Sequence, residues 1–300
     1  MASRIDVRIP ADGGIELGAW LFLPEASGAR PAITMAHGFA GTRAHGIERF
    51  AWAFATAGFV VLLHDHRNFG TSGGDIRGDI DPWRQIADWR RAISFLEERP
   101  EVDSARIGLW GTSYAGGHAI VLGASDRRLR CVVAQVPTIS GHEQGLRRVS
   151  PDALPALQQA FDEDERAQLR GELPRRQAVV SADPAVPAAY RSSEAADFYL
   201  QPIPPDVWEN HITLRSTRAA RMYEPGHWIA RVSPTPLLLI AARDDRVTMT
   251  DLALAAYERA LEPKRLVLLP GGHFDPYLDQ FPQAEAAATS WFREHLSDRP

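Results

Sequence analysis

The chain has little cysteine and no long apolar run, and each shortage excludes a class of protein. Cys131 is the only cysteine among the 300 residues, so no internal disulfide can form. Disulfide-stapled secreted domains are therefore excluded. The longest apolar stretches are far shorter than the roughly 20 residues that a transmembrane helix needs. The first residues, MASRIDVRIPADGG, lack the apolar core of a signal peptide. The sequence therefore predicts a cytoplasmic protein with no membrane partner.

The chain also has no excess of basic residues. Its formal net charge is −5, whereas a protein whose main partner is nucleic acid usually has a basic surface. We therefore expect no nucleic-acid partner. No cluster of cationic residues along the sequence marks a carboxylate or phosphate binding site. The length suits one large α/β domain with an insertion, or two small domains.

Short apolar runs alternate with helical patterns over most of the chain. This alternation is typical of a parallel sheet that helices cover on both faces. Arg4–Ile9 and Ile15–Leu23 come first and predict an antiparallel hairpin. The other predicted strands are Ala32–Ala36, Phe59–Leu63, Ile107–Trp110, Cys131–Val136, Leu237–Ala241 and Arg265–Leu269. The predicted helices are Ile47–Ala57, Asp81–Glu98, Ala115–Ala124, Leu252–Leu261 and Gln283–His295.

The alternation stops at Pro137 and resumes after Ser233. The segment between them has many prolines, mixed charge and no clear strand, with a helical pattern over Ser150–Arg170. A long segment of this kind inside an α/β chain indicates an insertion. We therefore predict a core formed by residues 1–137 and 234–300, and a largely helical cap formed by residues 138–233.

A serine stands where one predicted strand gives way to a helix. The strand Ile107–Trp110 stops at Gly111, Ser113 follows, and the helical pattern begins directly afterwards. A tight turn at such a place exposes the serine hydroxyl, and the N–H groups at the helix start point toward the same space. Ser113 is therefore the predicted nucleophile of an acyl-transfer site.

The sequence contains a second serine in a similar pattern. Gly70-Thr71-Ser72-Gly73-Gly74 fits the pattern G-x-S-x-G better than the segment around Ser113, which has Ala115 in the last position. However, Ser72 follows the polar stretch HDHRNF and precedes a glycine-rich loop. A motif of this kind needs its strand and helix. We therefore interpret Ser72 as a turn residue.

A nucleophilic serine needs a base, and the base needs a carboxylate that orients it. Ligand chemistry in parallel sheets gathers at the carboxyl ends of strands. Asp244 and Asp245 follow one predicted strand, and His273 follows the next, after two glycines. Of the two acids we favour Asp244, because it leaves the strand first. Asp245 would then be solvated or paired with Arg246.

The segment HGFAGT follows the strand Ala32–Ala36. Its small residues allow backbone N–H groups to face a ligand. We predict that the N–H of Phe39, with that of Tyr114, binds the oxyanion of the reaction. His37 in the same segment is interpreted first as a hydrogen-bonded residue that braces the loop.

Aromatic residues of the insertion are candidates for the substrate pocket, because such side chains often line acyl or aryl sites. They can equally pack the insertion onto the core or form a homodimer contact. Together with His37, the pocket candidates are Trp208, Tyr223 and Trp228.

A single metal-like string occurs at His64-Asp65-His66. Such strings in loops are usually solvated or hydrogen-bonded, and the chemistry predicted here needs no metal. We therefore expect neither a metal nor another cofactor.

These motifs resemble those of serine enzymes with the α/β-hydrolase fold. HGFAGT resembles the family's oxyanion loop, GTSYAG its nucleophile elbow, DDRV its acid loop and GGHF its histidine loop. HDHRNFGTSGG resembles a structural loop of the family, which accounts for Ser72. The resemblance covers Ile5–Ala134 and Pro236–His295. Within the family the chain is most similar to dienelactone-hydrolase-like and acetyl-xylan-esterase-like members, and to enzymes that release or transfer polyketide acyl chains.

The resemblance implies a mostly parallel, eight-stranded sheet with flanking helices and an inserted cap. It implies a hydrolase that cleaves a carboxylic ester or thioester of a small acyl substrate, with Ser113, Asp244 and His273 as its triad. Two alternatives keep this triad, namely acyl transfer to an acceptor other than water and cleavage of a carbon–carbon bond beside a carbonyl. A binding protein without activity is a third alternative, although such proteins usually lack part of the triad.

Overall fold

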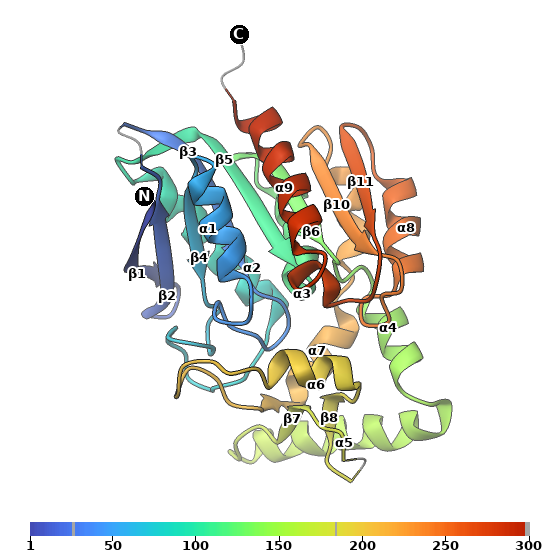
Figure 1. Ribbon diagram of the computed structural model, residues 1–300. Helices are drawn as coiled ribbons and strands as arrows, with labels where there is room; N and C mark the ends of the chain where they lie inside the picture. Colours follow the sequence, from blue (N-terminus) through green and yellow to red (C-terminus); the bar gives the residue numbers. More distant parts are fainter. Residues whose placement is uncertain (26–27, 184, 298–300) are drawn as a thin grey trace.

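The computed structural model describes residues 1–25, 28–183 and 185–297, and its centre is an eight-stranded sheet (Figure 1). The order of the strands is β1-β2-β4-β3-β5-β6-β10-β11. They are β1 (Ser3–Ala11), β2 (Ile15–Leu23), β3 (Arg30–Ala36), β4 (Val60–His64), β5 (Val102–Thr112), β6 (Leu129–Gln135), β10 (Leu237–Ala242) and β11 (Lys264–Leu269). All eight predicted strands are present, which confirms the predicted fold class.

Most neighbouring strands of this sheet are parallel. β1 pairs with β2 and β2 with β4 in antiparallel fashion, and the remaining five pairs are parallel. Gly13 and Gly14 connect β1 to β2 with φ angles of 86° and 72°. Only glycine adopts such angles readily, so these two residues close the predicted hairpin.

Helices cover both faces of the sheet. α1 and α9 pack on one face, and α2, α3 and α8 lie on the other (Figure 1). Their bounds are α1 (Glu48–Thr56), α2 (Pro82–Glu97), α3 (Tyr114–Ser125), α8 (Thr250–Arg259) and α9 (Phe281–Leu296). α3 is buried around almost its whole circumference, as its apolar sequence requires. None of the described helices is both long and apolar enough to cross a membrane.

Most of the segment between β6 and β10 lies at one end of the sheet (Figure 1), although its last element packs against α3 and α8. Its helices are α4 (Gly141–Arg148), α5 (Leu154–Leu169), α6 (Ser193–Tyr199) and α7 (Leu214–Met222), with 3-10 turns η1 (Pro151–Ala153) and η2 (Pro225–Arg231). It also contains a three-stranded sheet in the order β8-β7-β9, formed by β7 (Arg176–Val180), β8 (Ala188–Tyr190) and β9 (Ile212–Thr213). The expectation of no strand here is wrong, because these strands are too short to show an alternating pattern.

Hydrogen bonds fasten this segment to the loops that follow β3 and β4. The Tyr199 hydroxyl donates to the Phe39 carbonyl at 2.5 Å, and the Trp208 indole N–H donates to the Ala40 carbonyl at 2.7 Å. The Arg215 guanidinium binds Asp79 at 2.7 Å. The inserted segment therefore lies over the carboxyl end of the parallel strands, where the candidate site is found.

Candidate active site

Ser113 occupies a strained turn between β5 and α3. Its φ and ψ angles are 55° and −118°, a combination that non-glycine residues rarely adopt. A backbone hydrogen bond ties the turn to the neighbouring strand β6, because the Ser113 N–H donates to the Gln135 carbonyl at 2.9 Å. A side chain at Gly111 could not be accommodated, since its Cβ would lie 2.2 Å from the Ala115 carbonyl oxygen. The side chain of Ser113 is thereby directed away from the sheet, into a pocket.

His273 connects this serine to a carboxylate. Its Nε2 lies 3.0 Å from the Ser113 Oγ, and its Nδ1 lies 2.8 Å from Asp245 Oδ2. The imidazole is only 2% exposed. The loop that carries it bends at Gly271, with a φ of 87°, and the Gly271 carbonyl accepts a hydrogen bond from the N–H of Asp244. The structure thus brings together Ser113 and His273, as the sequence predicts.

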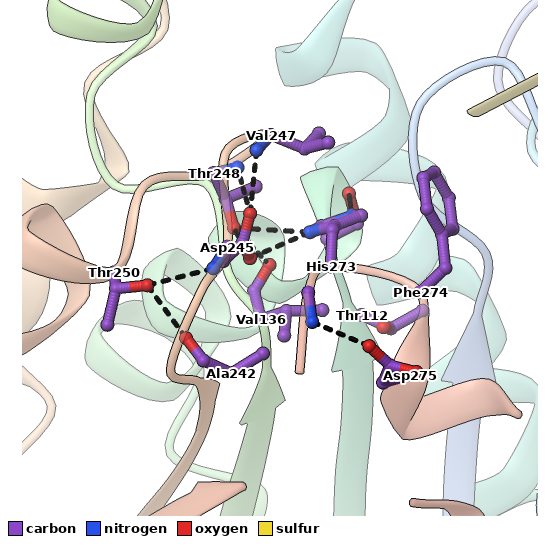
Figure 2. Close-up of polar contacts among 12 residues, drawn as sticks. Thr112, Val136, Ala242, Asp245, Val247, Thr248, Thr250, His273, Phe274 and Asp275 are labelled. Carbon is purple, nitrogen blue, oxygen red and sulfur yellow. Dashed lines mark hydrogen bonds and ion pairs between the residues drawn. The ribbon is translucent and has the colours of Figure 1, made fainter. Parts of the chain in front are cut away.

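The preference for Asp244 over Asp245 is wrong, because Asp245 is the carboxylate that contacts His273 (Figure 2). The side chain of Asp244 is exposed. The turn after β10 decides between the two. Asp245 Oδ1 accepts from the N–H groups of Val247 and Thr248 at 2.7 and 2.8 Å, which draws this carboxylate inward. The first acid after the strand is left pointing to solvent.

The charge of Asp245 fixes the tautomer of the histidine. Burial by itself would raise the pKa of Asp245, but the charge and hydrogen bond of His273, with hydrogen bonds from Thr248, lower it to about 2. An ionised carboxylate only accepts hydrogen bonds, so Nδ1 of His273 must carry the proton that it donates. Nε2 is then free to accept the proton of the Ser113 hydroxyl, which is the arrangement that a general base needs.

The loop after β3 passes directly over the serine. A Cβ placed on Gly38 would lie 2.8 Å from the Ser113 Cβ, so the backbone approaches as closely as glycine allows. Phe39 follows in this loop, and its ring meets the Tyr114 ring edge-on at 5.3 Å. Tyr114 is the first residue of α3, where a backbone N–H has no acceptor within the helix. The oxyanion site formed by the N–H groups of Phe39 and Tyr114 stays a prediction.

His37 braces this loop and also borders the pocket at Ser113. Its Nδ1–H donates to the Gly38 carbonyl at 2.9 Å, and its Nε2 accepts from the backbone N–H of His66 at 3.2 Å. Burial lowers the pKa of His37 to about 4, so the ring is neutral near pH 7. The pocket has a volume of about 20 Å³, and Phe198 and Tyr199 of the inserted segment also line it.

The other three pocket candidates lie elsewhere. Trp208 borders a different cavity, and its indole N–H donates a hydrogen bond to the Ala40 carbonyl. Tyr223 is buried, and its hydroxyl bonds to Nδ1 of His118 at 2.8 Å. Trp228 lies beneath the guanidinium of Arg231 at 5.4 Å. Of the four candidates, only His37 borders the pocket that contains Ser113.

Two polar partners of the site were not predicted. The Thr248 hydroxyl donates to Asp245 Oδ2 at 2.6 Å, and the Tyr277 hydroxyl bonds to the Thr112 hydroxyl next to Ser113. The first could have been found from sequence, because an aspartate followed three residues later by threonine is typical of a side-chain-capped turn. The second joins residues far apart in the chain and has no sequence signal.

Ser72 and the metal-like string make structural contacts, among them the hydrogen bond from the His66 N–H to His37 at the edge of the pocket. The Ser72 hydroxyl accepts from the Gly18 N–H at 2.9 Å and donates to the Asp65 carbonyl at 2.7 Å. Asp65 itself accepts from the Arg43 N–H at 2.8 Å. Among the described residues, no group of three or more histidine, cysteine or acidic side chains could hold a metal ion.

The chain is similar to a family of known enzymes over most of its length. A family model described as X-Pro dipeptidyl-peptidase (S15 family) matches residues 12–275. The chain belongs to the S15 family. Among named relatives of this S15 member is a "Thiohydrolase" of Eupenicillium brefeldianum, 28% identical over 92% of this chain and 89% of the relative. Another is the "Polyketide transferase grgF" of Penicillium sp, 29% identical over 91% of this chain and 90% of the relative.

A solved structure agrees closely with this S15-family fold. The crystal structure of the α/β hydrolase GrgF from Penicillium sp. sh18 superposes with a TM-score of 0.85 at 27% identity, covering 98% of this chain and 99% of that one. The resemblance to α/β hydrolases is therefore confirmed. The protein is a member of a hydrolase family.

Proposed function

We propose that this protein is a serine hydrolase that cleaves a carboxylic ester or thioester of a small acyl substrate through an acyl-enzyme on Ser113. The observation that carries the proposal is the hydrogen-bonded row of Ser113, His273 and Asp245, with distances of 3.0 and 2.8 Å. A serine, a base in reach of its proton and a carboxylate behind the base are the parts that nucleophilic acyl transfer requires.

The chemistry follows from the tautomer. His273 Nε2 takes the Ser113 proton as Oγ attacks the acyl carbon, and the imidazolium then gives this proton to the leaving alkoxide or thiolate. Asp245 stabilises the charged ring. The N–H groups of Phe39 and Tyr114 are proposed to bind the oxyanion, and each such donor is typically worth about 3 kcal/mol of transition-state stabilisation.

The size of the pocket supports hydrolysis. A volume of about 20 Å³ next to Ser113 is of the order needed for one water molecule. That water can attack the acyl-enzyme while His273 acts again as the base. Phe198 and Tyr199 of α6 close the pocket from the side of the inserted segment. We therefore propose that residues 138–233 act as a lid that limits access of bulk water.

The charges at the site favour acyl substrates over peptides. An enzyme that releases dipeptides must accept the positively charged N-terminus of its substrate, for which a carboxylate is the natural partner. No acidic side chain is among the described residues that line the pocket at Ser113 or the neighbouring cavity, which contains two arginines. We therefore expect no peptidase activity, despite the description of the family.

Acyl transfer is the second candidate function, and the polyketide transferase relative favours it. The same acyl-enzyme would then be attacked by an alcohol or amine in place of water. The two functions differ in their products, so turnover of one thioester with and without added alcohol separates them by the ratio of acid to ester formed.

The proposal is tested by steady-state turnover of aryl esters and of N-acetylcysteamine thioesters. Ser113→Ala should abolish turnover while the fold is retained by circular dichroism. Asp245→Asn should lower kcat by about 10⁴-fold, as expected when the orienting carboxylate is lost. Asp244→Asn is the matched control and should keep kcat within about twofold. Equal effects of the two aspartate variants, or full activity in Ser113→Ala, would refute the proposal.

A further inference from the structure

A second cavity lies against the candidate active site, between the core and the inserted segment. Its volume is about 120 Å³. Phe39 lines both this cavity and the pocket at Ser113, and Tyr114, which follows the serine, also lines it. An acyl group whose carbonyl oxygen lies at the N–H groups of these two residues could therefore extend its chain into this space.

Two guanidinium groups line this cavity, and neither has a carboxylate partner in the described part of the chain. Arg148 stands at the end of α4 and Arg221 near the end of α7. Their neighbours on the same helices are paired, since Arg147 binds Asp251 at 2.8 Å and Arg218 binds Glu165. No aspartate or glutamate is among the described residues that line the cavity.

Both arginines are held in place by the surrounding structure. Arg148 donates to the Val247 carbonyl and lies over the Tyr190 ring at 5.0 Å. The Arg221 side chain lies close to Gly145 of α4, where an added Cβ would stand 2.6 Å from its Nη1. Burial and the nearby charge of Arg148 lower the pKa of Arg221. Arg148 is itself partly open to solvent, and an anion bound between the two cations would relieve their repulsion.

We propose that Arg148 and Arg221 bind a carboxylate at the far end of the acyl chain of the substrate. This inference rests on the proposed function and adds a substrate class to it, namely acyl groups with a terminal carboxylate. Guanidinium groups suit a carboxylate because their N–H donors match its two oxygens. The two arginines are far apart in the sequence, so no cationic cluster is visible there.

The test compares paired thioesters of N-acetylcysteamine. Glutaryl, adipoyl and pimeloyl thioesters carry the terminal carboxylate, and the carboxamide of each chain length is its neutral counterpart. The native protein should prefer the carboxylate in kcat/KM for at least one length. Arg221→Met should reduce this preference by roughly 10- to 100-fold, the loss expected for one hydrogen bond to a charged group.

Two further variants separate the charge from the fold. Gly145→Ala keeps both arginines but forces the Arg221 guanidinium to move, so it should reduce the preference in the same direction. If Arg221→Met does not fold, Gly145→Ala replaces it as the test of the carboxylate site. Arg218→Met is the matched control on α7 and should leave the preference unchanged.

The outcomes for the two proposals are distinct. Turnover of both members of each pair without a preference for the carboxylate overturns the carboxylate site alone. The carboxylate site is also overturned if Arg221→Met and Gly145→Ala prefer the carboxylate as strongly as Arg218→Met does. Absence of turnover with all thioesters and aryl esters overturns the proposed function, and this inference with it.

Discussion

Acid should destabilise this protein through histidines that fold in the neutral form. Burial lowers the pKa of His37 and His45 to about 4, and that of His64 and His118 to about 3. In the unfolded chain these groups titrate at the ordinary value of 6.5. Below pH 6.5 the unfolded state therefore binds more protons than the folded state, and the free energy of unfolding falls as the pH falls.

The magnitude follows from the difference between the two states. For each of the four histidines, pH 5 is about 1.5 units below the pKa in the unfolded chain and still above the pKa in the folded protein. Each therefore costs about 2 kcal/mol of stability. Together they cost about 8 kcal/mol, which is comparable to the whole stability of a typical domain. We expect the free energy of unfolding to be several kcal/mol lower at pH 5 than at pH 8.

The assay is urea unfolding followed by circular dichroism between pH 8 and pH 5. His64→Gln removes one titrating group that is fully buried in the folded protein. Between pH 8 and pH 5 the free energy of unfolding of His64→Gln should fall by about 2 kcal/mol less than that of the native protein. His227→Gln, at an exposed position, is the control and should show the native loss. A stability that does not change with pH, or an identical loss in His64→Gln, would contradict the reasoning.

Two substitutions test the surroundings of the serine. Gly38→Ala should lower kcat/KM by about 100-fold or more, because the added Cβ would lie 2.8 Å from the Ser113 Cβ and must displace the loop. Steady-state kinetics of the folded variant measures this, and native activity would show that the loop position does not matter. Ser72→Ala should lower the free energy of unfolding by about 1–3 kcal/mol, because it leaves the Gly18 N–H without its acceptor. Its kcat/KM should be unchanged, and a large loss of activity would mean that the wrong serine has been assigned to catalysis.

The core of the fold could be predicted because its signals are local. Glycines mark the turn of the β1–β2 hairpin. Asp81 caps α2 by accepting from the N–H groups of Trp83 and Arg84, as the sequence predicts. Ser113 and His273 can be predicted for the same reason, since each follows a strand and comes within two residues of a preceding glycine. The parallel order of the strands then places both at one edge of the sheet.

The features that could not be predicted depend on side-chain contacts. Asp244 and Asp245 are adjacent and chemically identical, and only the hydrogen bonds of Val247 and Thr248 select the second. The partners of Trp208 and Tyr223 are likewise set by packing between the insertion and the core. No spacing in the sequence encodes the partners of Trp208 and Tyr223, because these contacts join residues far apart in the chain. At Asp245 the only local signal is Thr248, three residues later.

The most direct test of the central claim is to map the residue that a fluorophosphonate modifies. Intact mass spectrometry should show one adduct per chain, and peptide mapping should place it on Ser113. The adduct should be absent from Ser113→Ala and retained in Ser72→Ala. Labelling of Ser72 or another residue at the native rate, or labelling that persists in Ser113→Ala, would contradict the account.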